Sequence, residues 1–336
     1  MRHNIEIERY RAEMAAEWDR FVSCSRQPSF LFKRAYMDYH ADRFADYSLV
    51  ARRRGSIMAV LPAERDGKRN IVTSHRGLTY GGWITPQRHF NAATMLNVFE
   101  RAIEFMRRDN AESLIYTPIP YIYTVQPAEE DRYALFCLGA RQTGCGLSSA
   151  IRLHSPAPLN ESTRQATTLA RRNGVEVAES VEWSVFWQML TVCLAERHDV
   201  KPTHSLEEML LLRERFPENI RLFMAYAGGC PEAGAVVYVT PQVVHTQYMA
   251  TTPKGRAIKA LALLIRVLAE RFAPTHHYLD FGVSTENSGR ILNRGLLLQK
   301  SGQGGLGVAC PVFELRICGD PDVEAVGGTD FFGNRD

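Results

Sequence analysis

The sequence has 336 residues, of which 45% are hydrophobic and 23% are charged, with 40 basic and 37 acidic side chains. This composition is that of an ordinary folded protein and excludes a disordered or collagen-like chain, and the length fits two domains better than one. The net charge of +3 gives no overall basic surface, so it does not predict a nucleic-acid-binding protein and leaves only a local groove open for that role.

The sequence predicts a cytoplasmic protein with reduced thiols. No apolar run approaches the roughly 18 residues that span a bilayer. The first twenty residues, MRHNIEIERYRAEMAAEWDR, are too charged for a secretory signal. The seven cysteines are odd in number, scattered and never in a C-x-x-C pair, so we expect neither a disulfide framework nor a zinc site.

In the first half of the chain, three strands, a helix and a strand are expected in that order. The segments 46–55, 56–67 and 68–82 have the composition of consecutive antiparallel strands joined by glycine turns. Apolar residues recur at roughly helical spacing over 89–108 and predict a helix, and 111–120 then returns as a strand.

The same order recurs about 170 residues later, which indicates a duplicated domain. Strands are expected over 220–229, 232–241 and 242–252, a helix over 254–273, and a return strand over 275–283. Helices over 160–173, 182–198 and 205–216 lie between the copies, the last opened by a capping box of Ser205 and Glu208. We therefore expect a mixed α/β (α+β) fold of two tandem domains, 1–155 and 156–318, each a central mixed sheet flanked by helices, followed by a flexible tail, 319–336.

This duplicated unit resembles the GNAT acyltransferase fold, and the duplication resembles the FemAB-like branch of that superfamily. The branch carries a strand ending in Y/F-D-F-G, then a short helix and a glycine, and then K-x-G-F-G-G. The first element is matched by Asp280, Phe281 and Gly282. The later elements are matched by Gly295, Lys300, Gly302, Gly304 and Gly305, with Gln303 where phenylalanine is usual. The resemblance covers residues 15–317 and implies an N-acyltransferase whose two domains meet at a cleft.

The resemblance also implies a donor loop. In GNAT domains that use coenzyme A, a Q/R-x-x-G-x-G/A loop opens the long helix, and its backbone N–H groups hold the pyrophosphate. The corresponding segment here is TTPKGRAIKAL, which matches this pattern only in part. The alternative to a donor loop is an ordinary capped helix with a basic first turn. The donor-binding candidates are Thr252, Lys254, Gly255, Arg256 and Ala257. Acyl-CoA is the expected co-substrate and aminoacyl-tRNA the alternative, with no tightly bound cofactor.

Acyl transfer to an amine needs a base for the amine and a donor for the oxyanion. Asp280 is the candidate that positions or deprotonates the amine, with loop capping as its other role. From the resemblance, Lys300 donates to the oxyanion or binds a substrate phosphate; otherwise it is a solvated surface lysine. Tyr248 and His245 are three residues apart on one strand, so we expect them on opposite faces with at most one in the site. His198 is either a buried histidine or a group that faces the cleft.

Acceptor candidates come from three further segments and from Glu286, in the loop after Asp280, Phe281 and Gly282. The stretch SHRGLTYGG, 74–82, stands where the second copy has its donor loop but lacks the loop spacing, so it is interpreted as acceptor-binding or as an irregular glycine-bulged strand. Tyrosines of YTPIPYIYTVQP, 116–127, line the cleft or pack the domain interface. The segment 196–205 is dense in ionisable groups, but its spacing does not fit a metal site. The acceptor candidates are His75, Arg76, Thr79, Tyr80, Tyr116, Tyr121, Arg197, His204 and Glu286.

From these features we expect an N-acyltransferase that moves an acyl group, in the first place acetyl, from acyl-CoA to an amine of a small molecule, a sugar or a peptide. The alternative is an aminoacyl-tRNA-dependent enzyme that forms a peptide bond on a peptidoglycan precursor or a peptide metabolite. In that case the acceptor end of tRNA is a partner. A non-catalytic binding protein is the third possibility. Neither a membrane span nor a bound metal is expected in any of them.

Overall fold

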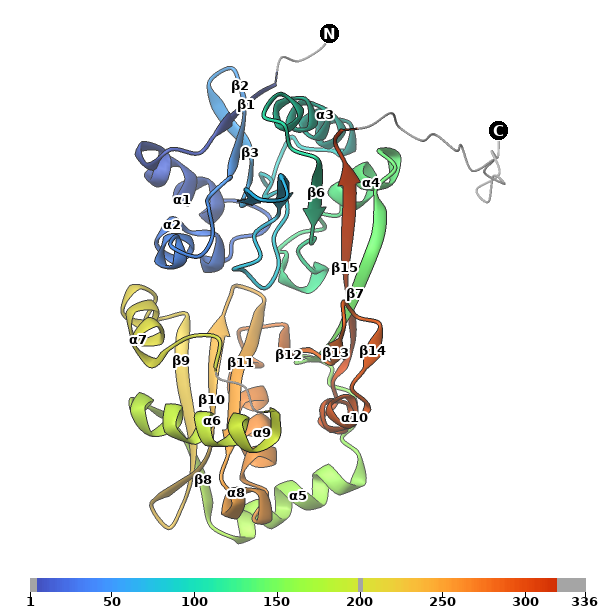
Figure 1. Cartoon of the computed structure of the whole chain (residues 1–336). Helices are drawn as coiled ribbons and strands as arrows, with labels where there is room; N and C mark the ends of the chain where they lie inside the picture. The colour runs from blue at the N-terminus through green and yellow to red at the C-terminus, as the bar shows by residue number, and fades with distance from the viewer. Residues whose placement is uncertain (1–4, 199–201, 319–336) are drawn as a thin grey trace, which may run out of the picture.

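The computed structural model describes residues 5–198 and 202–318, except for the side chains of residues 197 and 198. Ten strands form one mixed sheet in the order β4-β5-β6-β15-β7-β12-β11-β10-β9-β8, beside a small sheet, β1-β2-β3, and a hairpin, β13-β14 (Figure 1). The strands are β1 (Glu6–Arg9), β2 (Leu49–Arg53), β3 (Ser56–Leu61), β4 (Glu64–Asp66), β5 (Ile71–Thr73), β6 (Ser113–Tyr116), β7 (Arg141–Arg152), β8 (Val175–Ser180), β9 (Ile220–Ala227), β10 (Cys230–Val239), β11 (Val243–Thr251), β12 (Tyr278–Val283), β13 (Thr285–Glu286), β14 (Ile291–Leu292) and β15 (Leu306–Arg316). The helices are α1 (Ala15–Ser23), α2 (Arg34–Met37), α3 (Ala92–Arg108), α4 (Glu130–Cys137), α5 (Glu161–Arg172), α6 (Trp183–His198), α7 (Leu206–Arg215), α8 (Pro253–Ala257), α9 (Ala260–Phe272) and α10 (Arg294–Gly302), with short 3-10 turns at η1 (Ala12–Met14), η2 (Phe30–Phe32), η3 (Asp38–His40) and η4 (Tyr121–Tyr123).

The second half of the chain forms the predicted order of strands, helix and strand. β9, β10 and β11 are an antiparallel meander, and β12 returns parallel to β11 after α9. Because side chains alternate between the faces of a strand, β9 packs Leu222 and Met224 into the core that α6 covers, and Phe223 and Ala225 into the core that α9 covers. The prediction for this copy is confirmed.

The first half differs from the predicted three-strand meander. β2 and β3 pair antiparallel but belong to the small sheet with β1, while β5 pairs with β4 and runs parallel to β6. Residues 74–82 form a loop, because left-handed φ values of 60° at His75 and 103° at Gly82 are incompatible with a continuing strand. The prediction that SHRGLTYGG continues a strand is therefore wrong beyond Thr73.

Two long strands join the halves of the molecule. β7 and β15 pair antiparallel along most of their length and run from the upper half to the lower half in Figure 1. At one end β15 pairs with β6, and at the other β7 pairs with β12. The two mixed units therefore share one continuous sheet.

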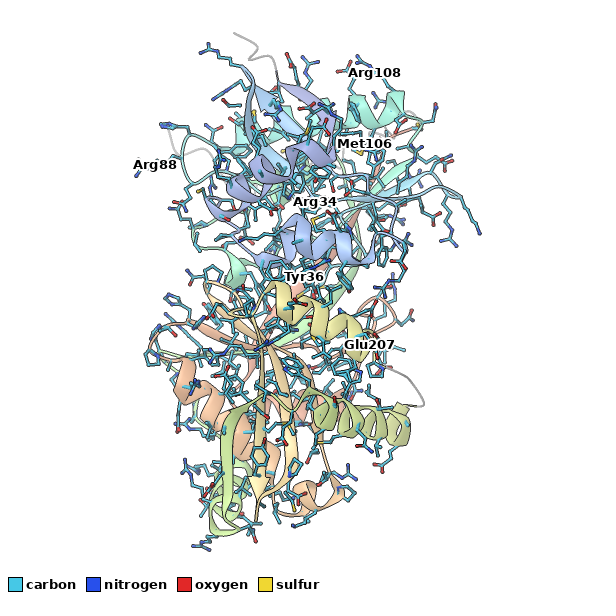
Figure 2. All side chains as sticks on the ribbon, turned by 90° about the vertical axis from the view of Figure 1, so that its left-hand side faces the viewer. Arg34, Tyr36, Arg88, Met106, Arg108 and Glu207 are labelled. Atoms are coloured by element: carbon cyan, nitrogen blue, oxygen red, sulfur yellow. The ribbon has the colours of Figure 1, made fainter. Side chains whose placement is uncertain are left out.

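Aromatic side chains fill the junction on the opposite side of the molecule. Tyr36 of α2 lies where the first half meets α7 (Figure 2), with its ring 6.0 Å from Phe216 and 6.3 Å from Tyr238. Phe30 lies 5.3 Å from Phe216 and 5.4 Å from Tyr238. These four rings are buried in one core that contains residues of both halves, so the two halves are packed against each other at this junction.

Candidate active site

The candidate site is a cavity of about 260 Å³ at a point where two parallel strands separate. β11 and β12 pair only over Val243–His245 and Tyr278–Asp280. β12 pairs with β7 on its other side from Tyr278 onward, and beyond Asp280 it continues with β7 alone to Val283, so the backbone leaves an open space between β11 and β12. The cavity is lined by Thr79, Tyr80, Thr117, Pro118, Pro120, Ile122, Tyr123, Ser148, His245, Gln247, Asp280, Gly282, Val283, Val308 and Cys310.

Asp280 is the centre of a hydrogen-bond network in this cavity. Its Oδ2 accepts from the Tyr123 hydroxyl at 2.7 Å and lies 2.8 Å from His245 Nδ1, and its Oδ1 accepts from Ser148 Oγ at 2.5 Å. Burial by itself would raise the pKa of Asp280, but the hydrogen bonds and charge of His245, with the bonds from Ser148 and Tyr123, outweigh it and lower that pKa. Although only 3% exposed, Asp280 is therefore an ionised carboxylate.

His245 is held by this carboxylate in the tautomer of a general base. Nδ1 faces Asp280 Oδ2, so we assign the ring proton to Nδ1, which leaves Nε2 as an acceptor. Nε2 forms no hydrogen bond with a described residue, and the ring lines the cavity. An acidic side chain that orients a histidine in this way is the arrangement that hydrolases use to make imidazole accept a proton.

The prediction that His245 and Tyr248 lie on opposite faces of their strand is wrong. In the pairing of β10 with β11, Tyr238 is opposite His245 and Val236 is opposite Tyr248, so Gln247 is an extra residue in a β-bulge. The bulge restores both side chains to one face. Only His245 lines the cavity, however, and Tyr248 instead contacts Trp187 of α6.

Lys300, on the last turn of α10, holds the end of β12 in place. Its Nζ donates to the carbonyl oxygens of Gly282 and Val283, both at 2.8 Å, and both residues line the cavity. Burial lowers the pKa of this amine to about 8, with a smaller opposing effect from the nearby Asp280 carboxylate. An ammonium group has three N–H bonds, so one remains for a substrate atom after the two carbonyls are satisfied.

A larger cavity of about 420 Å³ adjoins the first and shares Thr79, Tyr80 and Thr117 with it. His75 and Arg76 also line this second cavity, so the structure brings the four residues predicted from SHRGLTYGG to one cavity, and Thr79 and Tyr80 also line the cavity with Asp280. Burial lowers the pKa of His75 to about 4, so its ring is neutral near pH 7. The hydroxyl of Tyr80 is buried and meets no hydrogen-bond partner with good geometry among the described residues, although Ser29 is close enough to affect its pKa.

Several other predicted site residues lie elsewhere. Tyr116 is buried in the core, where its hydroxyl accepts from Trp83 N and donates to Asp131, and it lines neither cavity. Tyr121 is 51% exposed and also lies outside both cavities.

Two more candidates pair with neighbours away from Asp280. His204 Nδ1 lies 2.6 Å from the Tyr248 hydroxyl, and burial lowers the pKa of His204 to about 4. Glu286 is exposed on β13 and accepts from Asn293 Nδ2 at 3.1 Å. The side chains of Arg197 and His198 lie outside the described residues.

The predicted donor loop is closed by an acidic side chain. The carboxylate of Glu232, buried on β10, accepts from the Thr252 hydroxyl and lies 3.0 Å from Lys254 Nζ. A phosphate at this position would meet the charge of Glu232. A Cβ on Gly255 would come within 2.0 Å of the Glu232 carbonyl oxygen, so the glycine is needed for this contact rather than for a ligand.

The backbone N–H groups of the same loop are also largely used. Thr252 N donates to the Glu232 carbonyl at 2.9 Å, and Gly255 N donates to Thr252 Oγ1 at 2.8 Å. Pro253 has no N–H, and the long helix is interrupted by Lys259, which has a left-handed φ of 63°. The loop therefore has the geometry of a self-capped helix start and does not fit a pyrophosphate well. Arg256 lies 3.4 Å from Glu196, and Ala257 ends α8.

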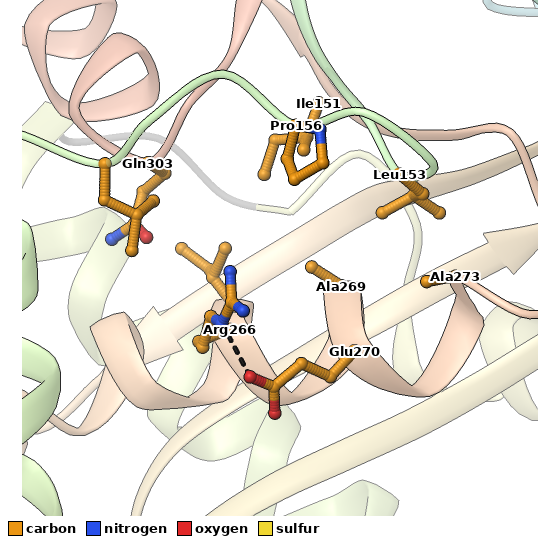
Figure 3. A pocket seen from close by; sticks show the side chains of 10 residues that line it. Ile151, Leu153, Pro156, Arg266, Ala269, Glu270, Ala273 and Gln303 are labelled. Carbon is orange, nitrogen blue, oxygen red and sulfur yellow. Dashed lines mark hydrogen bonds and ion pairs between the residues drawn. The ribbon is translucent and has the colours of Figure 1, made fainter.

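A third cavity, of about 80 Å³, lies between α9 and residues 151–159 (Figure 3). Its walls are mainly aliphatic, and Arg266 spans one side of it to reach Glu270 at 2.7 Å.

Among the described residues, no three histidine, cysteine, aspartate or glutamate side chains converge to hold a metal ion. Every helix within the described ranges is too short or too polar to cross a bilayer.

Comparison with known proteins agrees with the fold. Residues 161–287 match the family model described as an acetyltransferase (GNAT) domain. No curated protein matches the sequence.

Among solved structures, FemX is similar over 93% of this chain and 97% of its own, with a TM-score of 0.68 and 12% identity. A tandem GNAT protein from the clavulanic acid biosynthesis pathway is similar over 94% of this chain and 99% of its own, with a TM-score of 0.50 and 13% identity. The C-terminal domain of a putative lysylphosphatidylglycerol synthetase from Agrobacterium fabrum covers 78% of this chain and 81% of its own, with a TM-score of 0.51 and 11% identity. Residues 161–287 therefore match a GNAT domain, and the chain as a whole has the fold of FemX and of the tandem GNAT protein.

Proposed function

We propose that this protein is an aminoacyltransferase, which moves an aminoacyl group from aminoacyl-tRNA to an amine acceptor and forms an amide. The observation that carries the choice of donor is the Glu232 carboxylate in the loop where other GNAT domains hold the pyrophosphate of coenzyme A. The expectation from the sequence placed acyl-CoA first, and the closed loop reverses that order. A tRNA-borne donor does not need this loop, because its ester is delivered by a macromolecule.

The cavity supplies the groups that amide formation requires. The acceptor nitrogen attacks the ester carbonyl of the donor while Nε2 of His245 accepts its proton, and the ionised Asp280 stabilises the resulting imidazolium. The third N–H of Lys300 donates to the oxyanion of the tetrahedral intermediate. The ester C–O bond then breaks, and His245 returns the proton to the departing ribose oxygen of tRNA. No cofactor takes part in these steps.

The acceptor occupies the second cavity and reaches the first with its amine. Arg76 lines this second cavity and forms an ion pair with the buried Glu64, so its guanidinium is held in a fixed position. Tyr80 lines both cavities and has a hydroxyl that meets no hydrogen-bond partner with good geometry among the described residues. These two side chains recognise the part of the acceptor that extends from the reacting amine.

The donor is identified by following product mass with a panel of amines and either charged tRNA or acetyl-CoA. We expect a product with charged tRNA that disappears after RNase treatment, and none with acetyl-CoA. Calorimetry should detect coenzyme A binding at least about tenfold more strongly in Glu232→Ala than in the natural protein, because the variant removes the competing negative charge. Lys68→Ala, in an exposed turn of the first half, is the matched surface control.

Acyl-CoA remains the second candidate donor because the matching family model is described as an acetyltransferase domain. RNase-resistant acylation by the natural protein with acetyl-CoA would overturn the aminoacyl proposal. A complete lack of turnover with both donors over a broad amine panel would instead favour a non-catalytic binding protein.

Tyr80→Phe tests the acceptor-binding surface. We expect the KM for the acceptor to rise about five- to tenfold with little change in the KM for the donor, because one hydrogen bond to the acceptor is lost. Stability should be unchanged or slightly higher, since the hydroxyl meets no partner with good geometry among the described residues. Steady-state kinetics and urea denaturation measure the two effects, with the exposed Tyr133→Phe as control. An unchanged acceptor KM would reduce Tyr80 to a packing residue.

Arg76→Ala should raise the acceptor KM as well. This variant also leaves the buried Glu64 carboxylate without its ion pair, so a loss of stability is expected alongside the kinetic effect. Comparison with Tyr80→Phe separates the two contributions.

A further inference from the structure

Large exposed apolar side chains are concentrated in one segment of the second half, residues 283–306. Five of them, each between 41% and 72% exposed, lie on the end of β12, on β14, on α10 and at the start of β15. We call this the β14–α10 face; its apolar members are Val283, Ile291, Leu292, Leu298 and Leu306. The 24 residues from 283 to 306 thus contain five of the fourteen large hydrophobic side chains that are exposed in the described part of the chain. Such a concentration marks an interaction surface, whereas isolated exposed apolar residues do not.

The backbone of this face is firmly placed. Figure 1 shows the β13-β14 hairpin and α10 next to each other at one edge of the molecule. The hairpin tip packs so closely on β7 that a Cβ on Gly289 would lie 1.8 Å from the Cys145 carbonyl oxygen. Cys145 N also donates to the Ser288 carbonyl at 3.1 Å. The backbone that carries these apolar side chains is therefore held in place by contacts with β7, while the side chains themselves remain exposed.

The charges on the same face are positive. Arg290 and Arg294 are exposed, and neither forms an ion pair with a described residue. Glu286 is the only acidic residue between positions 283 and 306, and Asn293 already donates to it. The face therefore combines aliphatic side chains with two free guanidinium groups.

We propose that the β14–α10 face binds the surface of an anionic lipid bilayer. Aliphatic side chains enter the headgroup boundary while the two arginines pair with lipid phosphates, as in other peripheral membrane proteins. A second copy of the chain fits less well, because a twofold interface through this face would bring the arginines of both copies together with only the two Glu286 carboxylates, each already bonded to Asn293, to balance them. Charge complementarity thus favours the bilayer.

Docking in this way would place the membrane beside the candidate active site. Val283 belongs both to the β14–α10 face and to the lining of the cavity with Asp280. Lys300, on α10 itself, donates to the carbonyl oxygen of that same residue. The surface and the cavity are thus two sides of one short segment, although binding to the bilayer does not depend on the proposed reaction.

Vesicle sedimentation of the full chain tests the proposal. We expect it to sediment with vesicles of phosphatidylcholine and phosphatidylglycerol at 3:1, and much less with phosphatidylcholine alone or at high salt. Replacing both arginines by alanine should lower the partition coefficient about 25-fold, or about fivefold for each charge. Ile291→Glu with Leu298→Glu should lower it at least about tenfold. Leu210→Glu, at an exposed apolar position on α7, is the matched control and should bind like the natural protein.

Three outcomes would overturn the proposal. The first is no sedimentation of the natural protein with anionic vesicles. The second is an equal loss in Leu210→Glu, which would point to a general effect of added negative charge. The third is a dimer in light scattering that dissociates in the Ile291→Glu and Leu298→Glu variant, which would assign the face to a second copy. Circular dichroism checks that each variant is folded.

Discussion

Asp280→Asn should lower kcat/KM about 1,000-fold if His245 is the general base. An asparagine replaces one carboxylate oxygen by an amide donor, so it cannot accept from both Tyr123 and His245 and from Ser148 at the same time. The imidazole would then lose its assigned tautomer and the charge that stabilises its protonated form. Steady-state kinetics with the donor that the RNase experiment identifies measure the loss of kcat/KM. Nitrogen NMR of the histidine ring reports the tautomer directly.

Two further variants make this prediction specific. Ser148→Ala removes one bond to the same carboxylate without touching His245, so a loss of about tenfold or less is expected. Glu176→Gln changes an exposed carboxylate on the edge strand β8 and should have no effect. If Asp280→Asn kept the kcat/KM of the natural protein while remaining folded, the His245–Asp280 pair would not be the base.

Lys300→Met should lower kcat about 100-fold and remove one limb of the pH profile. With a pKa of about 8, Lys300 is an ammonium at lower pH and has a third N–H for the oxyanion. Above that pH the neutral amine has only two N–H bonds, and the carbonyls of Gly282 and Val283 use both. The natural protein should therefore lose activity as the pH rises through about 8, and Lys300→Met should not show this limb. Gln299→Met, at the preceding exposed position, controls for changes in α10.

The same lysine gives a stability test with a defined sign. Its pKa is lower in the folded protein than in the unfolded chain, so the unfolded state binds more protons between about pH 8 and 10.5. Stability of the natural protein relative to Lys300→Met should accordingly rise by about 1 to 3 kcal/mol from pH 7.5 to 10.5. Urea denaturation at the two pH values measures it. A difference that stayed constant would show that burial does not depress this pKa.

Local patterns predicted the second half of the molecule well. The strand repeats and the apolar stripe of α9 are local signals, and the capping box of Ser205 and Glu208 is present at the start of α7. Asp280 and Lys300 were predicted through a family motif; Asp280 lines the cavity, and Lys300 donates to the carbonyl oxygens of two residues that line it.

The contacts that define the site were not visible in the sequence, because they are long-range. Ser148 and Asp280 are 132 positions apart, and Tyr123 and Asp280 are 157 apart. A single-residue bulge at Gln247 changes which face Tyr248 occupies, and alternation of side chains cannot predict a bulge. Glu232 contacts the predicted donor loop from another strand, so the sequence of the loop alone could not predict this contact. The first-half meander was predicted wrongly because local patterns do not show that β3 and β5 belong to different sheets, and the end of β5 was missed because the left-handed conformation of His75 has no marker in the sequence.

The position of β15 also determines when the ten-stranded sheet can form during synthesis of the chain. β15 is the last strand within the described residues, yet it lies between β6 and β7 in the middle of the sheet. Until residues 306–316 have left the ribosome, β4, β5 and β6 have an open edge and share no ladder with the strands that follow. β15 thus joins two separate sheets into a single one. The sheet of the first half can be completed only after β15 has been synthesised, long after the other strands of that half.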